Sequence, residues 1–279
     1  MSLLEVSGLT VRFGRRQVVA IDDVSFTLGE QERLGIIGES GSGKTVTALA
    51  LMGLLPENAA VTGSVRVRGQ ETLGLGEAEY AKLRGDTLSM VFQEPMTALD
   101  PTMRVGRQVA EVLLLHARNT SGNSRQRVIE MLRRVGLADA ERIADSYPHQ
   151  LSGGQRQRVC VAMALINSPD LVICDEPTTA LDVTVQARVL KVLDEMLDAE
   201  HTACLFISHD LAVVSQVCSH VLVMLDGRIV ESGPIHRIFA TPSHPYTKGL
   251  VATAQLDKVA PGSPLPTVAD FYTRAGATR

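Results

Sequence analysis

The chain has 279 residues, of which 45% are hydrophobic, so it can bury a substantial core in one or two domains. Its formal net charge of −4 and its pI near 6.0 exclude the strongly basic surface typical of nucleic-acid-binding domains, and no nucleic-acid partner is expected. The sequence has no apolar run approaching the roughly 20 residues that span a bilayer. We therefore expect any membrane role to depend on partner proteins.

Four cysteines are widely spaced along the chain, and none forms a C-x-x-C pair. Each lies in an apolar stretch, which predicts buried reduced thiols. They are Cys160, Cys174, Cys204 and Cys218. Reduced thiols favour a cytoplasmic location.

The first third of the chain combines short strands with a glycine-rich turn. Residues 3–13 and 18–28 alternate between apolar and polar side chains, which predicts two half-buried strands. The apolar run 34–37 predicts a buried strand, and residues 46–55 predict a helix after the turn. Further strands are predicted at 63–67 and 88–92. We therefore expect antiparallel edges joined to a core that contains the strand, the turn and the helix.

The pattern becomes helical between residues 98 and 164. Apolar residues recur at three- and four-residue spacing in the segments 105–116, 125–135 and 140–147. The stretch 119–124, rich in Gly, Asn and Ser, is the predicted loop of this helical insert, and Pro148 predicts a helix end.

Strand and helix signals alternate in the last part of the chain. Strands are predicted at 171–174, 203–207 and 221–225, with helices at 183–199 and 211–217. This alternation predicts a parallel sheet with crossover helices. Asp226-Gly227 predicts a hairpin into a strand at 228–231. From Thr241 the chain is rich in proline, so we expect an irregular tail with one short helix at 246–254.

The turn after residue 37 matches the phosphate-loop pattern G-x-x-x-x-G-K-[ST] at every fixed position. Its residues are Gly38, Glu39, Ser40, Gly41, Ser42, Gly43, Lys44 and Thr45, followed by Val46 in the predicted helix. A loose match would more often be an ordinary strand-to-helix turn, but here the lysine and both flanks agree. Backbone N–H groups and a helix N-terminus converge on phosphate oxygens in such a turn. The chain is therefore predicted to bind a nucleoside triphosphate.

A second glycine motif, L-S-G-G-Q, precedes an apolar run that ends in Asp175-Glu176. The motif consists of Leu151, Ser152, Gly153, Gly154 and Gln155. Taken alone, it would fit a surface turn, and the two acidic residues would fit a solvated strand end. Their order, together with a phosphate loop, is far more specific than either motif alone.

These motifs, in this order, resemble the ATP-binding subunit of ATP-binding-cassette (ABC) transporters over essentially the whole chain to residue 255. The resemblance implies an α/β fold with a RecA-like P-loop NTPase core, an antiparallel β subdomain and an inserted helical subdomain. The core and β subdomain are expected in about 1–95 and 165–240, and the helical subdomain in about 96–164. Residues 256–279 are expected to form a Pro-rich C-terminal tail.

The resemblance also implies roles for single residues around ATP and Mg²⁺. Lys44 would meet the β- and γ-phosphates, while Thr45, Asp175 and Gln93 would hold the metal ion. Glu176 would be the general base that takes a proton from the attacking water. The implied reaction is hydrolysis of ATP to ADP and phosphate, coupled to transport.

Three further positions gain a role from the resemblance. His209 matches the switch histidine that contacts the γ-phosphate, although an isolated histidine is more often structural. Phe13 occupies the place of an aromatic that stacks on adenine, with a strand core residue as an equal alternative. Asp182 ends the segment Thr179-Ala180-Leu181-Asp182, which resembles the D-loop that contacts a second cassette.

In this family the L-S-G-G-Q signature closes over ATP held by another subunit. The resemblance therefore implies a head-to-tail dimer with a homologous second ATPase, as a heterodimer or a homodimer. ATP would hold the two subunits together, and loss of the γ-phosphate would let them open.

Three segments resemble the oligopeptide/dipeptide/nickel importer branch: 35–44, 91–101 and 241–247, the last reading T-P-S-H-P-Y-T. This branch implies two integral-membrane permeases and, indirectly, an extracellular solute-binding protein. The chain would then lie peripherally on the cytoplasmic face of the inner membrane.

Peptide is the first expected cargo, and nickel or a metal chelate is the alternative. Many peptide-importing relatives continue into a cysteine-rich region that can hold an iron–sulfur cluster, whereas this sequence has no cysteine after Cys218. No iron–sulfur cluster is expected here. A soluble non-transport ABC protein, such as a subunit of a phosphonate-cleaving complex, is the alternative of a different class.

Overall fold

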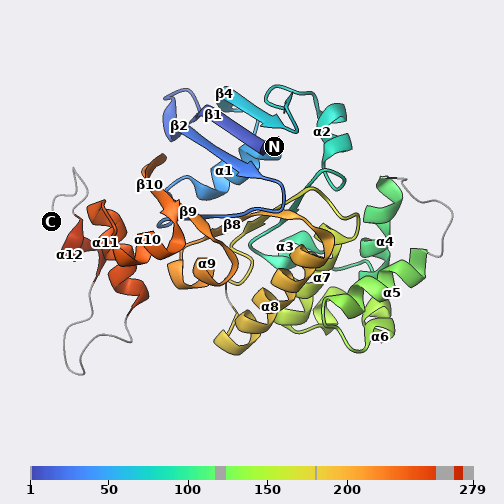
Figure 1. Cartoon of the computed structure of the whole chain (residues 1–279). Helices are drawn as coiled ribbons and strands as arrows, with labels where there is room; N and C mark the ends of the chain where they lie inside the picture. Colours follow the sequence, from blue (N-terminus) through green and yellow to red (C-terminus); the bar gives the residue numbers. More distant parts are fainter. Residues whose placement is uncertain (1, 117–123, 180, 256–266, 273–279) are drawn as a thin grey trace.

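The structure is a computed structural model that describes residues 2–116, 124–179, 181–255 and 267–272, arranged around two sheets (Figure 1). Residues 119–123 of the predicted loop, Ala180 of the D-loop-like segment and most of the predicted tail lie outside the described residues.

The larger sheet has six strands in the order β10-β9-β3-β8-β7-β6. All neighbours are parallel except the hairpin of β9 and β10. The strands are β3 Arg33–Ile37, β6 Leu88–Val91, β7 Leu171–Asp175, β8 Ala203–Ser208, β9 His220–Leu225 and β10 Arg228–Pro234. The middle strands are near-continuous apolar runs because helices or a second sheet cover both faces. The predicted parallel sheet is therefore present.

Successive residues of these strands pack into different cores. On β8, Leu205 and Ile207 face the side of the smaller sheet, whereas Cys204 and Phe206 face the core formed with helices on the opposite side. This alternation follows from the two-residue side-chain period of a strand. The four cysteines are buried and free, as predicted.

The smaller sheet is antiparallel, with the strand order β2-β1-β4-β5. Its strands are β1 Ser2–Phe13, β2 Val18–Gly29, β4 Ala59–Val67 and β5 Gln70–Glu71. Helix α1, Lys44–Leu51, packs Ala48 and Leu51 into the core shared by the two sheets. The helix ends before the predicted residue 55 because Gly53 follows with a left-handed φ of 62°.

Helices occupy the chain between β6 and β7, as predicted (Figure 1). They are α3 Pro95–Ala98, α4 Val105–Leu115, α5 Ser124–Arg134, α6 Ala140–Asp145, the 3-10 helix Pro148–Gln150 and α7 Gly153–Leu165. Helix α2, Glu77–Leu83, was not predicted. Within the described ranges, no helix is long and apolar enough to cross a membrane.

The C-terminal part contains more helix than the sequence predicted. Helices α8 Val183–Glu200, α9 Leu211–Val217 and α11 Pro245–Ala254 match the predicted segments, whereas α10 Ile235–Ala240 was missed. The prediction of an irregular tail beyond α11 was wrong at α12, Val268–Phe271. This helix forms because Thr267 and Asp270 make a capping box, and because Gly249 of α11 lets the α12 backbone approach closely.

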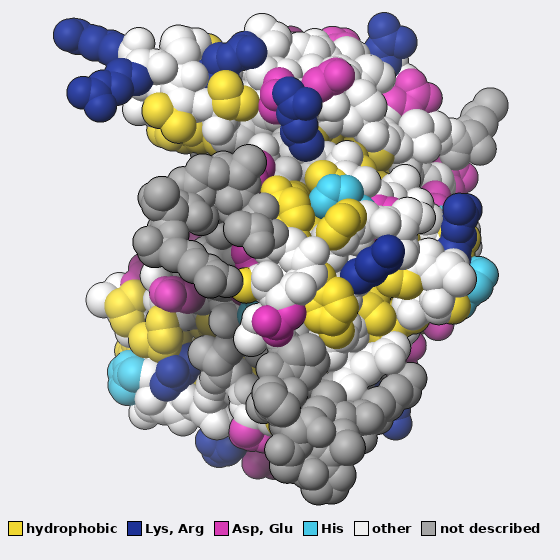
Figure 2. All heavy atoms as spheres, turned by 90° about the vertical axis from the view of Figure 1, so that its left-hand side faces the viewer, with side chains coloured by type: hydrophobic (Ala, Val, Ile, Leu, Met, Phe, Trp, Pro, Cys, Tyr) yellow, Lys and Arg dark blue, Asp and Glu magenta, His cyan; other side chains and the backbone are white. Residues whose placement is uncertain are grey.

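Charged side chains of both signs are interspersed on the face of the molecule seen in Figure 2.

Candidate functional site

The glycine turn lies between β3 and α1, where its glycines allow a close approach that other residues would prevent. A Cβ at Gly38 would lie 2.3 Å from the Met224 carbonyl oxygen, and one at Gly43 would lie 2.8 Å from the Ala20 carbonyl oxygen. Gly43 also has a left-handed φ of 106° and caps α1 without any side-chain hydrogen bond. The first N–H groups of α1 therefore remain available to phosphate oxygens.

The Lys44 side chain is buried inside this turn. Its Nζ donates to the Gly38 carbonyl at 2.8 Å and to the Glu39 carbonyl at 2.9 Å, and lies 4.0 Å from Glu176 Oε1. Burial lowers the pKa of Lys44, and the nearby carboxylates only partly offset this effect. The turn thus holds the Lys44 ammonium group on two backbone carbonyls. A bound phosphate can replace these carbonyls as the acceptor of its hydrogen bonds.

A hydroxyl and a carboxylate meet beside this lysine. Thr45, on the first turn of α1, donates from Oγ1 to Asp175 Oδ1 at 3.2 Å, and Asp175 ends the buried strand β7. Burial raises the pKa of Asp175, against the opposing effect of the Thr45 hydrogen bond. A buried carboxylate next to a hydroxyl is a pair of hard oxygen ligands suited to Mg²⁺.

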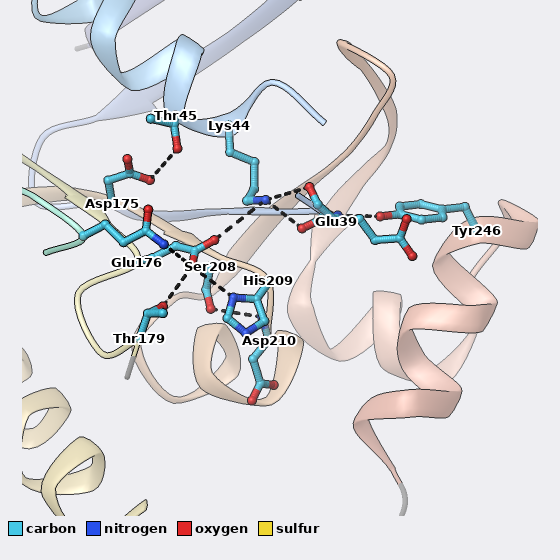
Figure 3. A network of polar contacts seen from close by, with 12 residues as sticks. Glu39, Lys44, Thr45, Asp175, Glu176, Thr179, Ser208, His209, Asp210 and Tyr246 are labelled. Carbon is cyan, nitrogen blue, oxygen red and sulfur yellow. Dashed lines mark hydrogen bonds and ion pairs between the residues drawn. The ribbon is translucent and has the colours of Figure 1, made fainter. Parts of the chain in front are cut away.

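Glu176 connects three segments of the site (Figure 3). Its Oε2 accepts from Gln93 Nε2 at 3.2 Å and from Thr179 Oγ1 at 2.8 Å, and it lies 3.1 Å from His209 Nδ1. Its backbone has a φ of 47°, a left-handed conformation that costs free energy for a residue with a side chain. The structure thus brings Gln93, Glu176 and His209 together, and adds Thr179, whose contact with Glu176 the sequence did not predict.

Some of these residues border a cavity of about 170 Å³, whereas Asp175, Thr179 and His209 do not line it. Its lining residues are Ala20, Ser40, Gly41, Gly43, Lys44, Thr45, Val46, Gln93 and Glu176. Ala20 is the member that sequence reasoning missed. Ser42, a residue of the turn, has a buried hydroxyl that has no hydrogen-bond partner within the described residues. Phe13 is half-buried against the core of the smaller sheet and does not line the cavity.

The signature residues form a separate structure at the start of α7. Ser152 caps the helix by accepting from the Gln155 N–H at 3.3 Å, and Gln155 accepts in return from the Ser152 N–H at 2.9 Å. Leu151 is buried in the core, and none of residues 151–155 lines the cavity beside Lys44. The structure therefore does not bring this motif to the chain's own phosphate turn.

The signature packs against the segment that precedes α8. Asp182 caps α8 by accepting from the Val185 N–H at 2.9 Å. A Cβ at Gly154 would lie 2.3 Å from Val185 Cγ1, so this glycine is needed for the close packing of α7 on α8.

Comparison with known proteins shows the family to which the chain belongs. The family model described as "ABC transporter" matches residues 21–179. The oligopeptide transport ATP-binding protein OppD of Salmonella typhimurium is 48% identical over 258 residues, covering 91% of this chain and 77% of the relative. The oligopeptide transport ATP-binding protein AppD of Bacillus subtilis is 43% identical over 256 residues, covering 90% and 78%.

Solved structures agree with the fold. The ATP-binding cassette MJ0796, in a dimeric post-hydrolysis state bound to ADP and Pi, superposes with a TM-score of 0.73 at 27% identity, covering 83% of this chain and 98% of that chain. CbiO1 of Clostridium perfringens, part of the transporter complex cbiONQ, gives 0.74 at 26% identity, covering 86% and 91%. These likenesses confirm the predicted cassette fold. The chain therefore belongs to the ATP-hydrolysing, ATP-binding subunits of ABC transporters, in the group of oligopeptide transport ATP-binding proteins.

Proposed function

We propose that this chain is the ATP-hydrolysing subunit of an importer that takes up dipeptides or oligopeptides. The observation that carries the proposal is the 48% identity with an oligopeptide transport ATP-binding protein over 91% of the chain. The relatives described above are named for oligopeptide transport, so peptide is favoured over nickel or a metal chelate.

Each site residue then has a chemical role. Lys44 leaves the carbonyls of Gly38 and Glu39 and binds the β- and γ-phosphates as a point charge. Glu176 accepts a proton from the attacking water, because its carboxylate lies at the edge of the cavity that the γ-phosphate enters. Gln93 and His209 hold this carboxylate in place and contact the water and the γ-phosphate.

Mg²⁺ is the metal that the residues fit. Thr45 and Asp175 supply two adjacent oxygen atoms, and Gln93 lines the same cavity. Few protein ligands are enough, since Mg²⁺ in nucleotide sites takes most of its ligands from phosphates and water. The ion would neutralise phosphate charge, and Asp175 and Thr45 would hold it in the cavity.

We further propose that the signature works in trans. Ser152, Gly153 and Gly154 stand at the N-terminus of α7, which presents N–H groups and a hydroxyl to an anion. A second, homologous ATPase would bring its own ATP to this helix end, and Asp182 and its neighbours would lie at the contact between the two subunits. Phe13 is proposed to stack on adenine at the edge of the same interface.

The remaining partners follow from the importer assignment. Two integral-membrane permeases would bind the helical insert and the segment after Gln93, and a solute-binding protein outside the cell would select the cargo. The chain would lie peripherally on the cytoplasmic face of the membrane, and no nucleic acid would take part.

Uptake in the host organism tests the proposal. Replacing the native chain with Lys44→Ala should abolish accumulation of labelled dipeptides and tripeptides and leave nickel uptake unchanged. Lys191→Ala is the matched control, because Lys191 is exposed on α8 and pairs on the surface with Glu195 at 3.8 Å. Loss of nickel uptake alone would assign the metal cargo instead. Normal uptake of both, with recovery of the chain only with soluble enzymes, would favour the non-transport alternative.

A further inference from the structure

A tyrosine of the C-terminal segment reaches the phosphate turn at Glu39, on the side away from Glu176 (Figure 3). Tyr246, at the start of α11, is fully buried, and its hydroxyl accepts a hydrogen bond from the Glu39 backbone N–H at 2.7 Å. The two residues are 207 positions apart in the sequence. Tyr246 does not line the cavity beside Lys44. Any effect on ATP must therefore pass through the turn itself.

The Glu39 N–H and the Gly38 carbonyl belong to one peptide group, which is planar and rigid. The carbonyl of this group accepts from Lys44 Nζ at 2.8 Å, while its N–H donates to Tyr246. The N–H and the carbonyl point in opposite directions within the plane of this peptide, so the two hydrogen bonds lie on opposite sides of it. A rotation that broke the tyrosine contact would also turn the carbonyl away from the ammonium group.

Tyr246 is itself held by several contacts. The Glu231 carboxylate on β10 accepts from the N–H groups of Ser243 and His244 at 2.8 and 2.9 Å, and His244 Nδ1 accepts from the Tyr246 N–H at 3.2 Å. The Tyr272 ring, just beyond α12, meets the Tyr246 ring edge-on at a centroid distance of 5.9 Å. Burial raises the pKa of Tyr246 to about 12, so its hydroxyl stays neutral under physiological conditions.

We propose that Tyr246 is a positioning residue of the ATP site. It fixes the plane of the Gly38–Glu39 peptide, so the turn keeps one conformation before and after Lys44 moves from its carbonyls to the phosphates. Preorganisation of this kind lowers the cost of ordering the turn when ATP arrives. The described residues that hold Tyr246, in 231–255 and 267–272, thereby contribute to the nucleotide site.

A competing explanation is that the bond only satisfies a buried tyrosine hydroxyl and helps to dock α11. The two explanations differ in what the hydroxyl changes. A docking role affects stability alone, whereas a positioning role also affects the affinity for ATP.

The test compares Tyr246→Phe with Tyr80→Phe in the full chain. Tyr80 is a matched control, because it is also buried and its hydroxyl bonds to the Thr72 side chain, away from the phosphate turn. Titration calorimetry with ATP and Mg²⁺ gives the Kd, and thermal unfolding gives the Tm. Loss of one hydrogen bond predicts about a fivefold higher Kd for Tyr246→Phe. Tyr80→Phe should lower the Tm and leave the Kd unchanged. An unchanged Kd for Tyr246→Phe, or an equal rise in both variants, overturns the proposal.

Amide hydrogen exchange of the unmodified protein gives a second test that needs no variant. Glu39 is an exposed residue, yet its N–H should exchange slowly because Tyr246 accepts its hydrogen bond. Exchange at the rate of an open loop would show that the contact does not hold the turn, and would overturn the proposal even if a variant failed to fold.

Discussion

Replacing Glu176 with glutamine should separate ATP hydrolysis from ATP binding. The amide has nearly the same size and can still accept from Gln93, Thr179 or His209 through its oxygen, so the local structure should persist. It cannot accept a proton from water at neutral pH. We therefore expect hydrolysis to fall by a factor of about 10²–10⁴, the usual contribution of a positioned general base.

The effect on binding follows from the charges in the cavity. Glu176 Oε1 lies 4.0 Å from Lys44 Nζ. Two unit charges at that distance attract each other by about 4 kcal/mol at an effective dielectric constant near 20. This attraction competes with the phosphates for the lysine, and the carboxylate also repels a bound γ-phosphate. Removing its charge should therefore leave the affinity for ATP unchanged or make it stronger.

The assay is phosphate release by the purified protein at saturating ATP and Mg²⁺, with the Kd for ATP measured in parallel. Glu195→Gln is the matched control, since Glu195 is an exposed carboxylate on α8 whose partner is Lys191. Hydrolysis by Glu176→Gln at the control rate would refute the general-base assignment. A large loss of ATP affinity would refute the charge argument.

Three further changes give distinct outcomes. Lys44→Ala should raise the Kd for ATP by about ten- to a hundredfold, because charge-assisted hydrogen bonds to the phosphates are lost. An unchanged Kd would contradict the role of Lys44 in binding phosphate. Gly154→Ala should destabilise the fold by about 1–3 kcal/mol, because its Cβ would lie 2.3 Å from Val185 Cγ1. Gly153→Ala is the control, because a Cβ there would lie 3.6 Å from Leu181 Cδ2, an ordinary contact distance. Equal Tm values for the two variants would contradict the packing role of Gly154. Burial opposes ionisation of Glu231, but hydrogen bonds from Ser243 and His244 outweigh it and lower its pKa. Glu231→Gln should therefore reduce the free energy of unfolding at pH 7, and denaturant titrations should show the difference disappearing as the pH falls below the ordinary value of 4.5.

Features encoded locally were predictable from the sequence. The apolar run before Gly38 and the glycine pattern up to Thr45 specify a strand, a turn and a helix within a few residues, and the structure has all three. The strands β7 and β8 were equally clear, because a parallel strand covered on both faces is apolar throughout.

Contacts between distant segments were not predictable in this way. The sequence identified Tyr246 only as part of a branch-specific motif, because a hydrogen bond to Glu39 across 207 positions has no periodic signal. Helix α12 was missed for a related reason. A four-residue helix has little intrinsic stability, and this one depends on packing against Gly249.

The state of the signature fits the proposal that a second subunit completes the ATP site. Ser152 and Gln155 already cap each other, so the turn before α7 is ordered without any ligand. The Ser152 hydroxyl accepts in that cap, which leaves its own proton free, and Gly153 and Gly154 occupy the first helical positions, whose N–H groups have no intrahelical acceptor. These donors lie together at the start of α7, and none of their residues lines the cavity beside Lys44. In the proposed dimer, an ATP carried by another subunit would meet this helix end, and closure would then depend on the γ-phosphate that hydrolysis removes.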